Sequence, residues 1–541
     1  MPFSSDCSTF RCRRDRGFFY PSAIFFIDAG GAMLVDILTG YVHVLQFDNL
    51  ITVVLGTLIG VALGAFPGLD CTVGVALLLP MTYAMSPAQA IILLSALYSG
   101  AVYAGQIPAI LFRVPGAPEA VVTTLDGYPM TQKGQAGKAL GMGLLASLCG
   151  GIFGVLGLTL VAPFLARVAL VFGPSEYAAL GILGLTAIAS LGSKSQIKAM
   201  ISGLFGLLFA TVGMDPIVGF PRFVFDTSVL KGGISFIPAV IGLFAAAEVY
   251  NQISRGMGST GSTNEKDKSA PPRIRVQFPS LRELKPLKWS SLRSALIGLG
   301  IGILPGVGAT TAAIVGYSQA VQFSKEPEKF GTGILEGVMA PEVANNAAAG
   351  GAMVPLLSLG IPGSATTAVM LGAFLLHGLR PGPLLLVQQR PLAFTIFAGM
   401  MLSNILFFFF GFIAIRFFIH LRRVPYPLIA AGILVFSAVG ANAMGDVSGM
   451  MMMFLFALLG FIMEKYNYSV APMILGLVLG PIIEPSFRRA LMMQEYDVVS
   501  ILLRPITLGL LIVSVIITIT PLVWQYRRRK SLRTSPISVG E

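Results

Sequence analysis

The sequence predicts an all-α integral membrane protein, a polytopic helical bundle with two structural repeats, and three observations lead to this prediction. Hydrophobic residues make up 55% of the 541 residues and charged residues only 11%, whereas soluble proteins carry about a quarter charged residues. The apolar runs are long and unbroken, as in LIVSVIITITPLVW near the C-terminus, which suits membrane helices rather than the alternating strands of an outer-membrane barrel. The third observation is a Gly/Pro pattern that occurs in both halves.

The length of the chain can supply about ten to twelve spans, since one membrane helix needs roughly 20 apolar residues. Residues 1–32 are interpreted as a start extension or a disordered tail, because a basic cluster precedes a short apolar stretch that Pro21 interrupts. The first membrane half is expected to span 33–250 as successive Gly-rich apolar segments. Small residues let membrane helices approach closely, so the 62 glycines indicate close helix packing.

A polar, Ser/Pro-rich segment at 251–293 separates the two halves and carries nine basic and three acidic residues. The second membrane half follows at 294–525, and the tail at 526–541 is again basic. Because basic residues lie at segment ends and in loops, the net charge of +12 indicates membrane orientation rather than nucleic-acid binding. The linker and the C-terminus are therefore expected on the cytoplasmic side of a bacterial inner membrane.

The sequence offers little equipment for catalysis or for a structural metal site. The four cysteines, Cys7, Cys12, Cys71 and Cys149, have no paired spacing, which argues against a disulfide framework and a zinc site. The chain holds three histidines and neither a His-Glu-x-x-His nor a Gly-x-Ser-x-Gly motif. We therefore expect a transport protein with no enzymatic activity and no cofactor, other than Na⁺ or H⁺ as a coupling ion.

The Gly/Pro pattern points to where such a protein works. The segment GAFPGLDCTVGVALLLP at 64–80 corresponds to GILPGVGATTAAIVGY at 302–317, and both contain Gly-x-x-Pro-Gly. Further along each half, Pro108 and Pro355 precede a second Pro-Gly dipeptide by seven residues. The second copy carries a nine-residue insertion between its two Pro-Gly dipeptides. Matched Gly/Pro interruptions in two halves are the best sequence pointer to a transporter's binding site, and an inverted orientation of the halves is expected.

Proline removes a backbone hydrogen bond and glycine permits unusual dihedrals, so a Pro-Gly pair breaks or re-enters a membrane helix. Such a break survives only inside protein or beside a water-filled cavity, and the restarted helix presents free N–H groups that suit an anion. We expect the four breaks to form one carboxylate-binding cavity. The predicted substrate-binding residues are Pro67, Gly68, Thr72, Arg113, Pro115, Gly116, Thr123, Thr124, Pro305, Gly306, Thr310, Thr311, Pro362, Gly363, Ser364, Thr366 and Thr367.

The same loops offer bare carbonyl groups that suit Na⁺. The predicted ion-coupling residues are Asn345, Asn346, Asp70, Asp126 and Glu342. Structural alternatives stay open for these polar side chains. Serine and threonine in membrane helices often bond to their own helix, and acids often cap helix ends.

Arg113 and His377 each admit two interpretations. Arg113 lies between the two prolines of the first break, where it can clamp a carboxylate or extend toward the membrane interface. His377 sits beside a turn and is interpreted as a helix-end histidine.

Several blocks of the sequence resemble the large permease subunit of the tripartite tricarboxylate transporter family. They include GAFPGL, VVTTLDGYPMTQKGQAGKALG, GILPGVGATTAA, PEVANNAAAGGAMVPLLSLGIPGSATTAVMLGAFLLHGLRPGPLL and APMILGLVLGPIIEPSFRRAL, in consistent order from about residue 48 to 525. The resemblance implies an ion-driven secondary transporter for citrate or a related carboxylate. It also implies two partners, a small membrane subunit and a periplasmic solute-binding protein.

The first half departs from the family pattern at three positions. Asp70 adds an acid to the first loop, Arg113 replaces a small or polar residue before the second Pro-Gly, and Gln106 replaces a small residue. One hypothesis is that Asp70 and Arg113 pair across the cavity and alter substrate choice. The second half keeps the family pattern closely.

The sequence therefore favours ion-gradient-driven uptake of a di- or tricarboxylate or a related organic anion, by alternating access of the two halves around a central site. The alternative in the same class is an organic anion transporter or channel that works without a binding-protein partner. An intramembrane enzyme lacks its motifs here, and a purely structural scaffold does not account for matched helix breaks.

Overall fold

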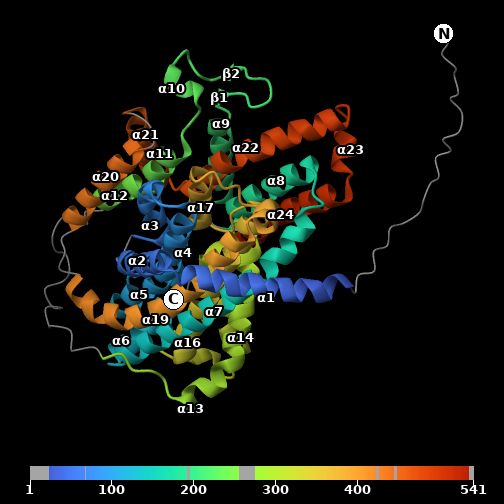
Figure 1. Ribbon diagram of the computed structural model, residues 1–541. Helices are drawn as coiled ribbons and strands as arrows, with labels where there is room; N and C mark the ends of the chain where they lie inside the picture. The colour runs from blue at the N-terminus through green and yellow to red at the C-terminus, as the bar shows by residue number, and fades with distance from the viewer. Residues whose placement is uncertain are drawn as a thin grey trace, which may run out of the picture.

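The computed structural model describes residues 24–66, 69–191, 195–254, 275–421, 426–443 and 447–534. These residues are overwhelmingly α-helical, and one short hairpin pairs β1 (Gly213–Met214) with β2 (Pro221–Arg222) in antiparallel fashion. Figure 1 shows a helical bundle with this hairpin at one end and the short helix α13 (Leu281–Leu284) at the other. The all-α prediction is thereby confirmed.

The described helices of the first half are α1 (Ile24–Val44), α2 (Phe47–Gly64), α3 (Cys71–Leu78), α4 (Pro87–Ala104), α5 (Gln106–Phe112), α6 (Thr124–Gln132), α7 (Ala136–Ala169), α8 (Pro174–Leu191), α9 (Gln196–Ala210), α10 (Ser228–Lys231), α11 (Phe236–Val240) and α12 (Ala247–Ser254). A π-helical turn at Ile241–Ala246 joins α11 to α12 in one span. Short 3₁₀ turns lie at Leu79–Ala84 and Pro118–Ala120.

Within the predicted linker, α13 and a 3₁₀ turn at Lys285–Leu287 lead into α14, the first helix of the second half. A further 3₁₀ turn lies at Pro327–Lys329. The described helices of the second half are α14 (Lys288–Ile303), α15 (Gly308–Phe323), α16 (Leu335–Leu359), α17 (Ala365–Leu376), α18 (Pro383–Gln388), α19 (Arg390–Leu421), α20 (Tyr426–Ala443), α21 (Val447–Lys465), α22 (Val470–Met493), α23 (Val498–Leu502) and α24 (Pro505–Thr534).

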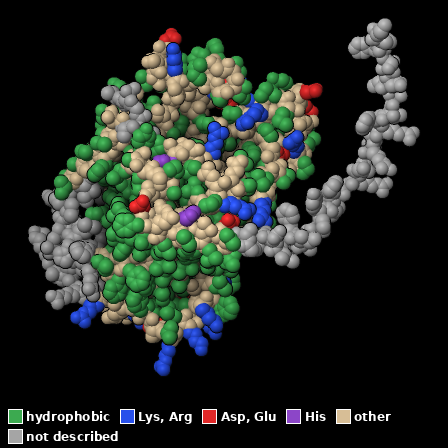
Figure 2. Space-filling model, in the orientation of Figure 1, with side chains coloured by type: hydrophobic (Ala, Val, Ile, Leu, Met, Phe, Trp, Pro, Cys, Tyr) green, Lys and Arg blue, Asp and Glu red, His purple; other side chains and the backbone are tan. Residues whose placement is uncertain are grey.

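Within the described ranges, seven helices are long and apolar enough to cross a membrane. Helix α7 is the longest of these spans, and Leu156, Leu160 and Phe164 on its surface are exposed. Figure 2 shows hydrophobic side chains spread over a broad zone of the visible face, with lysine and arginine side chains at the α13 end and also over the middle and upper parts of this face. Exposed apolar surface of this extent is stable against lipid and not against water, so the chain is a multi-pass membrane protein.

Glycines bring α2 against α4 and α14 against α16. A Cβ atom on Gly64 would collide with the backbone of Ala101 on α4, and one on Gly302 would lie 2.5 Å from the Ala348 carbonyl oxygen on α16. Each glycine stands three residues before the proline of its Gly-x-x-Pro-Gly motif. The two matched contacts support the predicted repeat, whose inverted orientation stays a prediction.

The three Pro-Gly dipeptides that the structure describes lie at breaks between helices, as predicted. Helix α14 ends at Ile303 and α15 starts at Gly308, with Gly306 at φ 81° and Gly308 at φ 73° in the left-handed region. Pro67 and Gly68 lie outside the described residues, although α2 ends at Gly64 and α3 starts at Cys71.

The second pair of breaks is built on close backbone contacts. A Cβ atom on Gly116 would lie 2.6 Å from the Gly64 carbonyl oxygen, and one on Gly363 would lie 2.9 Å from the Gly302 carbonyl oxygen. In each half, therefore, the second break packs against the end of the helix that precedes the first break. The predicted breaks are brought together by this packing.

Candidate functional site

A cavity of about 300 Å³ lies where the broken helices of both halves meet. It is lined by residues of all four breaks and of the neighbouring helices. The lining residues are Asp70, Cys71, Thr72, Tyr98, Pro118, Glu119, Gly306, Val307, Gly308, Ala309, Thr310, Thr311, Ile314, Ser364, Ala365, Thr366, Ser469 and Ala471. We call it the central cavity.

Side chains from the two halves touch each other at the wall of the central cavity. The hydroxyl oxygens of Thr72 and Thr366 lie 2.9 Å apart, and the Cys71 sulfur lies 3.2 Å from the Thr366 hydroxyl oxygen. The Cys71 thiol also donates to a carboxylate oxygen of Glu119 at 3.6 Å. The first break of the first half is therefore in direct contact with the second break of the second half.

Three helices begin at the central cavity, and two of them have capped N-termini. The Asp70 carboxylate caps α3 by accepting from the Val73 N–H at 2.9 Å. Ser364 caps α17 in a capping box with Thr367, whose N–H donates to the Ser364 hydroxyl at 3.2 Å. Helix α15 has no side-chain cap. Its first N–H groups and partial positive charge are thus free for an anion.

The hydroxyl groups at the start of α15 differ in their bonding. Thr311 donates to the Val307 carbonyl oxygen at 3.1 Å. Thr310 lines the cavity, and its hydroxyl has no hydrogen-bond partner among the described residues. The Thr310 hydroxyl can therefore bind a ligand without breaking an existing bond.

The charged residues that line the central cavity are acids. Asp70 and Glu119 both line it, and the lining includes no lysine or arginine within the described part of the chain. An anion in this cavity therefore needs a cation beside it or a protonated carboxyl group, because like charges at close range repel strongly in a low-dielectric site.

Glu119 is not among the site residues predicted from the sequence, although the sequence carries a signal for it. Glu119 is the third residue after the dipeptide Pro115-Gly116, and Thr366 is the third after Pro362-Gly363. An alignment of the two halves places this acid opposite a predicted binding residue. Glu119 is 6% exposed.

A second buried polar cluster surrounds Glu342 on α16. The Thr123 hydroxyl donates to one carboxylate oxygen at 2.5 Å, and the Ser147 hydroxyl lies 3.4 Å from the other. The Gln106 side-chain amide in turn donates to the Ser147 hydroxyl at 2.9 Å. Thr123, predicted to bind substrate, thus contacts a predicted ion-coupling residue instead of lining the central cavity.

The two predicted asparagines next to Glu342 behave differently. Asn346 donates to the Glu342 backbone carbonyl at 2.9 Å, which is the local bonding typical of polar residues in membrane helices. Asn345 is fully buried, and neither polar atom of its side chain has a partner within the described structure. A buried amide without partners is costly, so Asn345 marks a place where a ligand or water is expected.

Asp126 lies outside the central cavity and holds a loop. Its carboxylate accepts from the backbone N–H groups of Gly331, Gly333 and Ile334 at 2.8 to 3.0 Å, and from the Tyr317 hydroxyl at 2.9 Å. These bonds fix the segment that leads into α16.

Arg113 is also outside the central cavity. It is exposed, with its guanidinium carbon 6.0 Å from the centre of the Tyr128 ring, and it forms no ion pair with Asp70 among the described residues. The hypothesis of an Asp70–Arg113 pair is wrong, because Asp70 caps α3 and the Arg113 side chain extends to the surface. Thr124 is half-buried outside the central cavity and donates to the Val121 carbonyl.

His377 lies at the C-terminal end of α17, and its Nε2 is 3.4 Å from the Thr82 hydroxyl. This agrees with its interpretation as a helix-end histidine. Cys7 and Cys12 lie outside the described residues, and Cys71 and Cys149 are free thiols.

Comparison with known proteins gives a family and two relatives. The profile of the Tripartite tricarboxylate transporter TctA family matches residues 50–475. A protein of Agrobacterium vitis, described as an uncharacterized 52.8 kDa protein in the TAR-I ttuC′ 3′ region, is 35% identical over 503 residues, 92% of this chain and 98% of the relative. Another from the same organism, described as an uncharacterized protein in the TAR-II ttuC′ 3′ region, is 35% identical over 228 residues, 41% of this chain and 93% of the relative. No solved structure matches the chain.

Proposed function

We propose, from the premise that the chain belongs to the tripartite tricarboxylate transporter TctA family, that it carries a di- or tricarboxylate through the bacterial inner membrane by ion-coupled uptake. The family is one of transporters and not of enzymes. Family membership gives the transporter class, and the substrate, the coupling ion and the dependence on partner proteins are proposed in addition to it.

The observation that carries the proposal is the uncapped N-terminus of α15 at the central cavity. Free N–H groups at Gly308 and Ala309, with the Thr310 hydroxyl beside them, form a neutral anion site of the kind that helix N-termini provide. A carboxylate of the substrate binds there. The acids Asp70 and Glu119 face the same space and hold the coupling cation, which offsets the charge of the anion.

A further role in coupling is proposed for the enclosed cluster around Glu342. Its hydroxyl and amide neighbours are oxygen donors of the type that Na⁺ prefers, and a carboxyl group in this position can equally take up H⁺. The proposal therefore retains Na⁺ and H⁺ as alternatives.

The proposed partners are a small membrane subunit and a periplasmic solute-binding protein that delivers the carboxylate. The basic segment around α13 lies on the cytoplasmic side by the positive-inside rule, which places the β1–β2 hairpin on the outer side. Alternating access then opens the central cavity to each side in turn.

Uptake of radiolabelled citrate, succinate, malate and tartrate tests this proposal in cells that express the complete three-protein system. Thr310→Val should lower the uptake rate at low substrate concentration roughly tenfold, because valine keeps the shape and loses the hydroxyl donor. Thr124→Val is the matched control, since Thr124 does not line the central cavity and its hydroxyl donates to the Val121 carbonyl in the turn before α6, and it should leave uptake unchanged.

Two results would contradict the proposal. If the wild-type system takes up none of the four carboxylates, carboxylate transport is wrong. If uptake is the same when the binding protein is omitted, the dependence on that partner is wrong and the partner-free alternative stands.

A further inference from the structure

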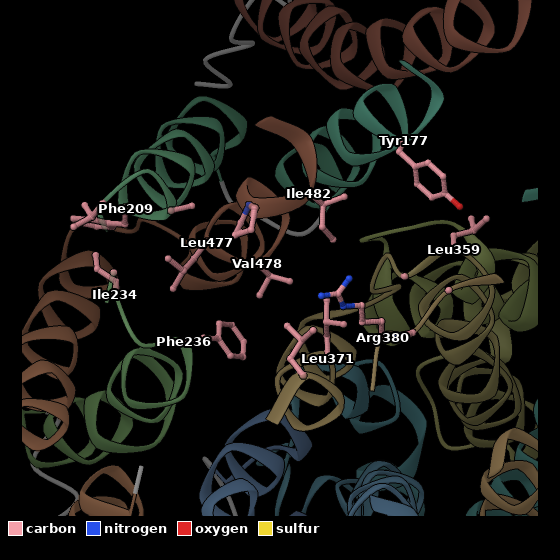
Figure 3. Close-up of a pocket in the computed structure, with 18 of the residues that line it drawn as sticks. Tyr177, Phe209, Ile234, Phe236, Leu359, Leu371, Arg380, Leu477, Val478 and Ile482 are labelled. Atoms are coloured by element: carbon pink, nitrogen blue, oxygen red, sulfur yellow. The ribbon is translucent and has the colours of Figure 1, made fainter. Parts of the chain in front are cut away.

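A second and larger cavity, of about 670 Å³, lies on the other side of the α16–α17 break from the central cavity. Its wall is apolar and includes Phe209, Phe236, Leu371 and Leu477. Arg380 is the charged residue among those that line it in the described chain. Figure 3 shows the Arg380 side chain directed into the space between Leu371 and Ile482.

The backbone around Arg380 is tied to the end of α16. The Gly382 N–H donates to the Leu357 carbonyl at 3.2 Å, and Gly360, at φ 74°, packs closely against the Pro381 carbonyl. The guanidinium itself is exposed and forms no ion pair or hydrogen bond with any described residue. A cation thus stands unpaired over an apolar cavity.

The segment 359–365, at the α16–α17 break, contributes residues to the walls of both cavities. Leu359 and Gly360 line the larger cavity, and Ser364 and Ala365 line the central cavity. The residues between them, 361–363, are buried.

The larger cavity lies toward the end of the molecule that carries the hairpin. Val212 and Gly232 to Ile234, which flank the hairpin and α10, form part of its wall. The hairpin and α13 lie at opposite ends of the bundle (Figure 1). Under the proposed orientation, the larger cavity is on the outer side.

We propose that the larger cavity is an outer vestibule in which Arg380 binds a carboxylate group of the substrate before it reaches the central cavity. This inference rests on the proposed function. The central cavity is lined by Asp70 and Glu119 without a basic residue among the described ones, so a positive charge outside it is needed to attract an anion. Apolar walls strengthen that attraction, because they lower the local dielectric constant.

The first test compares Arg380→Gln and Arg380→Lys in the complete system, with citrate, succinate, malate and tartrate as probes. For whichever probes the wild type takes up, Arg380→Gln should raise KM roughly tenfold and leave Vmax within about twofold, since a charge-assisted hydrogen bond to substrate is lost. Arg380→Lys keeps the charge and should raise KM less. Higher salt should reduce the difference between wild type and Arg380→Gln, because the group is exposed to solvent.

A second test changes the charge within one variant. Arg380→Cys is treated from outside with membrane-impermeant sulfonatoethyl methanethiosulfonate, which adds a negative charge, or with the aminoethyl reagent, which adds a positive one. The positive adduct should restore a low KM and the negative one should raise it further. The treated wild type controls for the four native cysteines, and this comparison holds even if Arg380→Gln does not reach the membrane.

Each outcome separates this inference from the proposed function. Wild-type uptake with an unchanged KM in Arg380→Gln overturns the vestibule alone, whereas absence of wild-type uptake overturns the proposed function. Equal effects of the two adducts would also overturn the vestibule. An Arg380→Gln effect seen in phosphatidylglycerol vesicles and absent in pure phosphatidylcholine vesicles would assign the cavity to a lipid phosphate instead.

Discussion

Arg113 ends α5 in the left-handed backbone region, with φ at 59°. Gly360 ends α16 in the same way, with φ at 74°. Each stands five residues after the matched prolines, Pro108 and Pro355. At this position the second half has glycine, the residue for which the left-handed conformation costs least. The first half has arginine, whose Cβ atom makes this conformation less favourable.

Arg113→Gly should therefore stabilise the protein by about 1 kcal/mol, because glycine adopts the left-handed region without steric conflict. The reverse change at the matched position, Gly360→Ala, should destabilise it, since its added Cβ also meets the Pro381 carbonyl. Thermal unfolding of the purified protein in detergent measures both. A lower melting temperature for Arg113→Gly would contradict this account.

Whether a predicted site residue lines the central cavity depends on the direction in which its side chain points. The sequence correctly identified the breaks, because proline and glycine act on the backbone wherever they occur. It did not separate Thr310, which lines the central cavity, from Thr123, which contacts Glu342. That distinction depends on how each helix is rotated in the bundle.

At the scale of elements, glycine contacts set the distance between α14 and α16. Gly298 and Gly302 both lie against backbone atoms of α16, whereas a Cβ atom on Gly300 would meet nothing within 4 Å. These three glycines lie two residues apart on α14, and two of them pack against α16 while the third does not. The sequence alone cannot tell which of them pack.

Gly302→Ala should destabilise the protein by roughly 1 to 3 kcal/mol, because the added methyl group forces α14 and α16 apart. Gly300→Ala is the matched control on the same helix and should be neutral or slightly stabilising, since alanine has the higher helix propensity. Melting temperatures of the two variants in detergent decide the matter. Equal effects would refute the packing explanation for these glycines.

At the scale of the whole molecule, an ion-pair network joins the β1–β2 hairpin of the first half to α22 of the second. Arg222 donates to both carboxylate oxygens of Glu484 at 2.6 and 3.2 Å, and Arg488 donates to Asp215 at 2.6 Å. The N–H groups of Val218 and Ile217, together with Arg488, lower the pKa of the Asp215 carboxyl below its ordinary value of 3.8. The charged form of Asp215 is therefore the one that the folded hairpin favours.

This lowered pKa predicts a pH-dependent contribution to stability. Because the pKa falls on folding, the contribution is fully present above pH 3.8 and is lost as the pH falls through the folded value. Between pH 5 and 7 the melting temperature of Asp215→Asn should lie below that of the wild type by a constant amount, and the difference should shrink below about pH 4. The exposed Glu328→Gln variant is the control and should show no such difference. A gap that stays constant down to pH 3 would exclude this role for Asp215.

The sequence by itself determined the membrane class, the helical fold and the position of the helix breaks, because hydropathy and the backbone effects of proline and glycine are local properties. The sequence also indicated the family, because whole blocks of residues resemble the sequences of that family in consistent order. Only the tertiary structure decided which breaks share a cavity, that Glu119 lines it, that Asp126 and Arg113 do not, and that Arg380 faces a second cavity. Those facts depend on helix rotation and on contacts between residues that are hundreds of positions apart, and no local pattern encodes them.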